Sequence, residues 1–254
     1  AWNGLMIGSL AYGGQHLNQP RYVAAARKAA DFVLANMRKD GRLLRSYRGG
    51  EARLEAYLED YAFLADGLLD LHDATHERRY LDEARRLMEV LSERYGDKER
   101  GGFFFTASDQ EELLLRSKDA YDRAIPSGTG MATRVLLRLA GETGGTRPRE
   151  LARRSLDAFV SLMERAPRGT ESLILGTAMY FDGAAGTAKA SGSAAEEQPD
   201  VRVRKRPVTA ELFTSRVAAA PGEAFPVAVR LAVDEGWHVN SAKPLNKELV
   251  ATSV

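Results

Sequence analysis

The fold is decided by the stretch Ala56-Tyr57-Leu58-Glu59-Asp60-Tyr61-Ala62-Phe63-Leu64. Two carboxylates stand between two tyrosines, directly before apolar residues with the spacing of a helix. Either carboxylate alone fits the first turn of a helix, because the free N–H groups and the dipole there are positive. Similar polar and aromatic clusters precede two other expected helices. We therefore predict that several helix starts line one pocket.

The composition narrows the classes of function. The chain has 254 residues, 44% of them hydrophobic and 28% charged, as in ordinary globular proteins of one large or two smaller domains. Its net charge of +1 argues against nucleic-acid or membrane-surface partners. No cysteine is present, which excludes disulfides and thiol chemistry within these residues and leaves the compartment unknown. No apolar run approaches the roughly 18 residues that would span a bilayer.

The first two thirds of the chain predict paired helices. Similar amphipathic segments begin at Pro20, Arg78 and Pro148, at an irregular spacing longer than the 33–34 residues of tetratricopeptide or ankyrin repeats. This pattern indicates helical hairpins separated by long loops, where functional residues are expected. After two helices on either side of Pro20 and a short extended piece at 43–47, we expect further helices over 61–74, 80–95, 127–139, 148–163 and 172–181.

The rest of the chain changes character. Residues 183–199 are rich in Ala, Gly and Ser and predict a flexible linker. Apolar residues then alternate, for example from Val227 to Val233, as in strands. We expect an all-α domain over 1–182, the linker over 183–199 and a partial immunoglobulin-like β domain over 200–254.

Common catalytic and metal motifs are missing. His72 and His76 are four residues apart on one expected helix, but no HExxH pattern surrounds them. No GxSxG motif, phosphate loop or dinucleotide fingerprint occurs either. We therefore expect no metal and no cofactor.

Three loop clusters remain as candidate sites: Trp2 to Gly4, Tyr57 to Tyr61, and Gly101 to Ser127. Aromatic rings beside carboxylates and amides suit sugar recognition, and paired carboxylates suit acid–base chemistry on glycosides. A structural alternative exists for the third cluster. Phe103 to Phe105 could form a β-hairpin that caps the core, and its aspartates, Asp119 and Asp122, could pair with the basic residues Arg116, Lys118 and Arg123.

Four motifs in order, WNGL at Trp2, LEDYAFL at Leu58, GGFFFT at Gly101 and YDRAIPSG at Tyr121, resemble the thioredoxin-domain-containing family that includes spermatogenesis-associated protein 20. Its members join a thioredoxin-like domain to an all-α toroid of the six-hairpin glycosidase type. The resemblance implies a mainly α fold, a partial (α/α)6 toroid, and a chain that is the middle of a longer protein without its thioredoxin-like domain. The stretch GWHVNSAKPL at Gly236 is similar to the N-terminal domain of the thiol:disulfide interchange protein DsbD.

The resemblance also implies a site. Its catalytic candidates are Glu59, Asp60 and Asp122. Its ligand-binding candidates are Trp2, Asn3, Tyr61, Tyr121 and Ser127. If the helix starts share one rim of the toroid, these residues meet there, and at least one carboxylate should be partly buried with a raised pKa.

The related sugar epimerases use histidine for proton transfer, and no histidine lies in the loop clusters, which argues against epimerisation. The expected function is binding or processing of a carbohydrate. The alternative is a non-enzymatic scaffold within a thiol-redox protein. About seven helices are expected where six hairpins need twelve, so one side of the toroid should be open, with apolar helix faces exposed.

Overall fold

The computed structural model describes residues 1–110, 115–190, 208–214 and 227–233. The chain divides into two compact units, Ala1–Gly192 and Ser193–Val254, and each is described here by itself.

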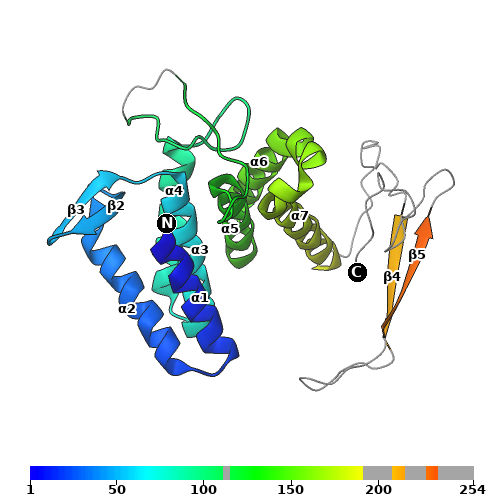
Figure 1. Cartoon of the computed structure of the whole chain (residues 1–254), viewed down its shortest axis with the longest axis horizontal. Helices are drawn as coiled ribbons and strands as arrows, with labels where there is room; N and C mark the ends of the chain where they lie inside the picture. The colour runs from blue at the N-terminus through cyan, green and yellow to red at the C-terminus, as the bar shows by residue number, and fades with distance from the viewer. Residues whose placement is uncertain (111–114, 191–207, 215–226, 234–254) are drawn as a thin grey trace. The chain divides into compact units, whose positions relative to one another are not determined.

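The first unit is an array of helical hairpins, as the sequence predicts. Each of the hairpins α1/α2, α3/α4 and α5/α6 joins two helices through a short turn, and α7 follows a single 3-10 turn (Figure 1). The helices are α1 (Trp2–His16), α2 (Pro20–Asn36), α3 (Leu58–Thr75), α4 (Arg78–Arg94), α5 (Gly128–Thr143), α6 (Thr146–Arg165) and α7 (Glu171–Ala190), with the 3-10 turn at Pro167–Gly169.

The helices form two layers. In one layer α1, α3, α5 and α7 pack against one another in sequence, while α2, α4 and α6 each pack against the helix before them. The burial patterns explain this arrangement. Helix α3 is buried on nearly every side from Leu58 to Leu71, which suits a helix enclosed by neighbours. Helix α4 buries only one stripe, which includes Tyr80, Ala84 and Leu91, and exposes its charged face.

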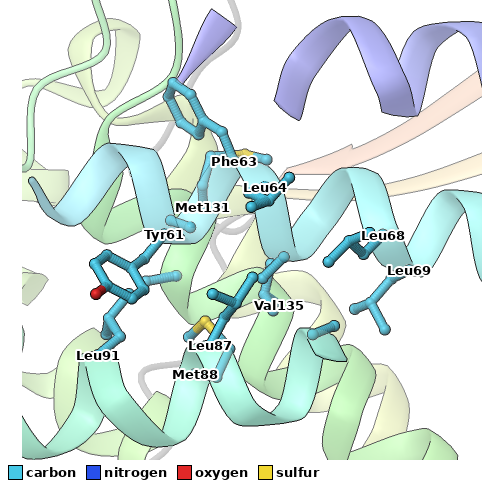
Figure 2. Close-up of a cluster of buried hydrophobic side chains, with 14 of the residues drawn as sticks. Tyr61, Phe63, Leu64, Leu68, Leu69, Leu87, Met88, Leu91, Met131 and Val135 are labelled. Atoms are coloured by element: carbon cyan, nitrogen blue, oxygen red, sulfur yellow. The ribbon is translucent and has the colours of Figure 1, made fainter. Parts of the chain in front are cut away.

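The core lies where α3, α4 and α5 meet (Figure 2). Tyr61 and Phe63 of α3 are among its largest fully buried side chains. Burial of a large apolar side chain contributes about 1.5–3 kcal/mol, so this cluster is a main source of stability. The labelled members are Tyr61, Phe63, Leu64, Leu68 and Leu69 from α3, Leu87, Met88 and Leu91 from α4, and Met131 and Val135 from α5.

Glycines allow α1 and α3 to approach closely. A Cβ atom placed on Gly67 would lie 2.3 Å from the carbonyl oxygen of Gly4, and one placed on Gly4 would lie 2.5 Å from the backbone of Phe63. Because backbone atoms cannot move aside as a flexible side chain can, only glycine fits at these positions.

A small antiparallel sheet lies between α2 and α3. It comprises β1 (Arg38–Lys39), β2 (Arg42–Arg48) and β3 (Glu51–Glu55), in the order β1-β2-β3. Strand β2 contains the extended piece expected at 43–47. The β-hairpin considered for Phe103 to Phe105 is wrong: in the described part of that segment, the only pairing is an isolated bridge between Gly96 and Phe103.

Helix α7 continues to Ala190, so it enters the segment 183–199 that we expected to be a linker. The second unit contains β4 (Val208–Thr214) and β5 (Val227–Val233), which pair in antiparallel fashion. The stretch from Gly236 that resembles DsbD lies outside the described residues. Of the helices described, none combines the length and apolar character required to cross a membrane.

Candidate functional site

The starts of α1, α3, α5 and α7 lie at one end of the array, beside the β2–β3 hairpin and the long segment between α4 and α5 (Figure 1). This is the common rim that hairpin repetition predicts. Specific contacts join each helix start to the next, and two of the expected catalytic aspartates make several of these contacts.

Asp60 joins α1 to α3. One of its carboxylate oxygens accepts a hydrogen bond from the Ala1 nitrogen at 2.6 Å. The other accepts from the backbone N–H of Tyr57 and from the Arg45 guanidinium, both at 2.9 Å. Asp60 is 3% exposed, and the Arg45 guanidinium balances its buried charge. Asp60 therefore serves the first turn of α3, which is the structural role that the sequence allowed for either Glu59 or Asp60.

Asp122 joins α5 to α7 in the same manner. It accepts hydrogen bonds from the backbone N–H of Ser127 at 2.7 Å, from the backbone N–H of Ser172 at 2.7 Å and from the Ser172 hydroxyl at 2.5 Å. Ser127 is buried and caps α5, because its hydroxyl accepts from the N–H of Gly130. Asp122 and Ser127 therefore fix two helix starts.

The starts of α3 and α5 touch directly. A Cβ atom on Gly128, the first residue of α5, would lie 3.1 Å from the Leu58 side chain and 3.3 Å from the backbone nitrogen of Glu59. The close approach brings the loop before α5 alongside the first turn of α3.

A cavity of about 500 Å³ lies at this junction. A volume of this size falls in the usual range for sites that bind small molecules. It is lined by Glu59 from α3 and by Phe105, Ser117, Lys118, Asp119, Tyr121, Arg123, Ile125 and Pro126 from the segment between α4 and α5.

Glu59 is held at the cavity by an aromatic and ionic stack. Its carboxylate lies 3.2 Å from the Arg45 guanidinium, which also lies 4.7 Å from the centre of the Tyr57 ring. The Tyr57 ring in turn stacks on Phe105, with centres 4.7 Å apart and planes 22° apart. The backbone carbonyl of Phe105 accepts from the N–H of Leu58, which fixes this loop to the start of α3.

Asp119 is the lining carboxylate with a perturbed pKa. Burial raises the pKa of its carboxyl above the ordinary value, with a smaller contribution in the same direction from the charge of Asp122. The positive charge of Arg123 and backbone hydrogen bonds from Gly128 and Tyr121 act in the opposite direction. A partly buried carboxyl in a cavity with a raised pKa is a frequent property of general acids.

The two basic residues of the lining differ in their partners. The Lys118 ammonium lies 2.7 Å from a carboxylate oxygen of Asp97 and 2.6 Å from the carbonyl oxygen of Gly101. The Arg123 side chain is exposed and forms no ion pair with any residue in the described part of the chain. The structural alternative for this loop expected Asp119 and Asp122 to pair with its basic residues. Neither Lys118 nor Arg123 lies at ion-pair distance from either aspartate.

The expected site residues are thus divided among different positions. Glu59 and Tyr121 line the cavity. Tyr61 is 2% exposed, and its hydroxyl accepts from the N–H of Leu43, so it lies in the core. Trp2 is 73% exposed on α1, and Asn3 lies beside a separate pocket of about 30 Å³, which has room for a water molecule and not for a sugar.

Asp119 and Phe105 are among the lining residues that the sequence interpretation did not select. Both belong to the cluster from Gly101 to Ser127, so the sequence located the segment. No periodic sequence pattern encodes the path by which this segment folds back on α3. The sequence therefore could not show that Asp119, and not Asp122, lines the cavity. Among the described residues, no group of three or more His, Asp or Glu side chains is arranged to hold a metal ion.

Comparison with curated proteins reveals relatives by sequence. The chain is homologous to spermatogenesis-associated protein 20 of Rattus norvegicus and of Homo sapiens, with 36% identity to each over 178 residues. The match covers 66% of this chain and 23% of each relative, so the chain spans about a quarter of the length of these relatives. No protein-family model matches the chain.

Comparison with solved structures shows the fold. A GH76 α-mannanase from Bacteroides thetaiotaomicron matches with a TM-score of 0.56 at 16% identity, over 73% of this chain and 53% of the mannanase. Cellobiose 2-epimerase from Bacillus thermoamylovorans matches with a TM-score of 0.51 at 14% identity, over 62% of this chain and 42% of the epimerase. A D-mannose isomerase gives a TM-score of 0.50 at 13% identity, over 62% of this chain and 41% of the isomerase. The first unit therefore has the α/α toroid fold of these carbohydrate-processing enzymes, and the expected fold class is confirmed.

Proposed function

We propose that the helical unit binds a carbohydrate in the cavity between the starts of α3 and α5, with Glu59 and Tyr121 as ligand-binding residues. The observation that carries this proposal is the composition of the lining. Two aromatic rings, Phe105 and Tyr121, and two carboxyls, Glu59 and Asp119, come together in one space of about 500 Å³. Ring faces pack on the apolar faces of sugars, and carboxyl oxygens accept hydrogen bonds from sugar hydroxyls. The α/α toroid fold shared with sugar-processing enzymes supports this proposal by analogy.

The direct test is a calorimetric titration of the full 254-residue chain with D-mannose and with cellobiose, the sugars in the names of two fold relatives. We expect at least one of them to bind, and Tyr121→Ala to weaken that binding about tenfold, equivalent to about 1.4 kcal/mol. Tyr12→Ala is the matched control, since Tyr12 is 59% exposed on α1 and Tyr121 is 47% exposed. Absence of binding by D-mannose, by cellobiose and by acidic derivatives of D-mannose, or equal losses in both variants, would contradict the proposal.

If the unit also processes its ligand, Asp119 is the residue suited to donate a proton, because burial favours its neutral form. Glu59, which is ion-paired with Arg45, would supply the second carboxylate that glycoside chemistry requires. With methyl α-D-mannoside as substrate, whose alkoxide leaving group must be protonated, Asp119→Asn should lower kcat at least about 100-fold and leave the sugar affinity within about threefold. Equal kcat values for the variant and the wild type would contradict this role.

A second candidate function is that of an interaction module in a longer protein. We propose that the intact protein also carries a thioredoxin-like domain, as the resemblance of the four sequence motifs implies. The observation that favours an interaction role is the exposed apolar surface on the two edge helices. Trp2 and Met6 of α1 are 73% and 58% exposed, and Leu175 and Phe181 of α7 are 54% and 63% exposed. Binding of a separately produced thioredoxin-like domain to the chain, abolished by Trp2→Ser and Met6→Ser together, would support this role.

A further inference from the structure

We infer that the cavity selects a sugar bearing a negatively charged group, a carboxylate or a phosphate, and that Arg123 determines this selectivity. The inference rests on the proposed carbohydrate site and specifies its class of ligand. It follows from counting which charged side chains of the lining already have partners.

The negative charges of the lining are already balanced or disfavoured. The Glu59 carboxylate lies 3.2 Å from the Arg45 guanidinium. Burial disfavours the ionised form of Asp119. The Arg45 guanidinium therefore offsets the Glu59 charge, and the positive charge of Arg123 acts on Asp119, which together reduce the repulsion that an anionic ligand would meet.

The positive charges differ in what they leave available. The Lys118 ammonium lies 2.7 Å from the Asp97 carboxylate, and its pairing holds it against the loop. Arg123 lines the same cavity and is exposed, and within the described residues its guanidinium has no carboxylate at ion-pair distance. The positive charge of Arg123 nevertheless influences the lining, because it works to lower the pKa of the Asp119 carboxyl.

Hydrogen bonds fix the backbone at Arg123. The N–H of Arg123 donates to the carbonyl oxygen of Ile125 at 3.0 Å, which closes a tight turn. The preceding residue, Asp122, accepts hydrogen bonds from backbone N–H groups at the starts of α5 and α7. A guanidinium at a cavity can donate two parallel hydrogen bonds to a carboxylate or phosphate, whereas a neutral hydroxymethyl group cannot accept such a pair.

The test compares three ligands that differ at one carbon of the same sugar: D-mannose, D-mannuronate and D-mannose 6-phosphate. Calorimetric titration of the full 254-residue chain at low ionic strength should show at least tenfold tighter binding of one or both anionic sugars than of D-mannose. The arm that binds more tightly identifies carboxylate or phosphate as the preferred group. The preference should fall as salt is added, because Arg123 is exposed to solvent.

Arg123→Gln should reduce the preference for the anionic sugar to twofold or less. Arg78→Gln is the matched control, since the Arg78 side chain is 83% exposed at the start of α4, and it should retain the full preference. Equal binding of neutral and anionic sugars by the wild type would overturn the inference while the proposed function stands. A preference that survives Arg123→Gln would also overturn it. If none of the three sugars binds and cellobiose also fails, the proposed function itself is contradicted.

Discussion

At the scale of single residues, three acidic side chains expected at one site have different tasks. Asp60 and Asp122 each use both carboxylate oxygens to hold helix starts together, whereas Glu59 faces the cavity. Their sequence contexts are alike, because each stands near an aromatic residue and a helix start. The difference lies in which donors the fold brings to each carboxylate, and local sequence does not encode this.

Asp122 should therefore matter for stability. Asp122→Ala removes the acceptor for two backbone N–H groups and one hydroxyl at the starts of α5 and α7. Hydrogen bonds to a charged group contribute about 1.5–3 kcal/mol each and are not additive, so we expect a loss of about 2–4 kcal/mol in the free energy of unfolding. Urea denaturation measures this free energy of unfolding. Asp157→Ala, on the exposed face of α6, is the control and should cost less than about 1 kcal/mol. A change at Asp122 no larger than that at Asp157 would refute its structural role.

A second residue-scale prediction concerns Asp70. Together with Asp66 and Asp73 of α3, it surrounds Arg138 of α5, and each carboxylate lies 2.8 Å from the guanidinium. Burial, with the charge of Asp66, raises the pKa of Asp70 from 3.8 to about 6 despite Arg138. The folded state therefore holds this proton more tightly than the unfolded state. The stabilisation from Asp70 is fully present below about pH 4 and is lost as the pH rises through about 6.

Asp70→Asn removes this pH dependence, since the amide is neutral throughout. We expect the variant to be more stable than the wild type by about 2 kcal/mol at pH 8 and to have nearly equal stability at pH 3.5. Denaturation curves at the two pH values provide the measurement. Asp73→Asn is the control, because Asp73 is 50% exposed and should change stability little. A variant that is less stable than the wild type at pH 8 would show that the ion pair with Arg138 outweighs the desolvation of Asp70.

At the scale of elements, the packing of α1 on α3 depends on glycine. Gly67→Ala would place a methyl group 2.3 Å from the carbonyl oxygen of Gly4, so the two helices would have to separate. We expect a loss of about 2–3 kcal/mol in the free energy of unfolding. Gly13→Ala in α1 is the matched control: apart from the adjoining backbone of α1, no atom lies within 4 Å of the added methyl group, and the higher helix propensity of alanine should stabilise the chain by about 0.5–1 kcal/mol. Thermal denaturation of both variants tests the contrast, and changes of the same sign would contradict the close contact.

Much of the element scale could be predicted from the sequence. Helices α4 and α6 repeat apolar residues at the helical period, so their existence and approximate bounds follow from which face must be buried. The segment between α4 and α5 could not be predicted, since its path is set by single contacts such as the hydrogen bond from the N–H of Phe105 to the carbonyl oxygen of Ser117. For the same reason the sequence indicated Glu59 and Tyr121, which line the cavity, and did not distinguish Asp119 from Asp122.

At the scale of the whole molecule, the first unit is an array with two edges. Apolar side chains on α1 and α7 are exposed in the described unit, and we expect them to make this unit associate. Sedimentation velocity should show concentration-dependent association of the chain. Trp2→Lys combined with Met6→Lys should reduce it. Val160→Lys, at a 45% exposed position on α6, should not. A monomer at all concentrations would contradict this expectation.

The central claim is that the cavity between the starts of α3 and α5 is the ligand site, and hydrogen–deuterium exchange tests it most directly. The full chain is compared with and without a saturating amount of whichever sugar binds in the titrations. We predict that the sugar slows exchange at residues 57–60 and 115–128, which surround Glu59, Asp119, Tyr121 and Arg123, and leaves α2 and the second half of α6 unchanged. Slower exchange confined to α1 and α7, or no change at either cavity segment, would contradict the claim.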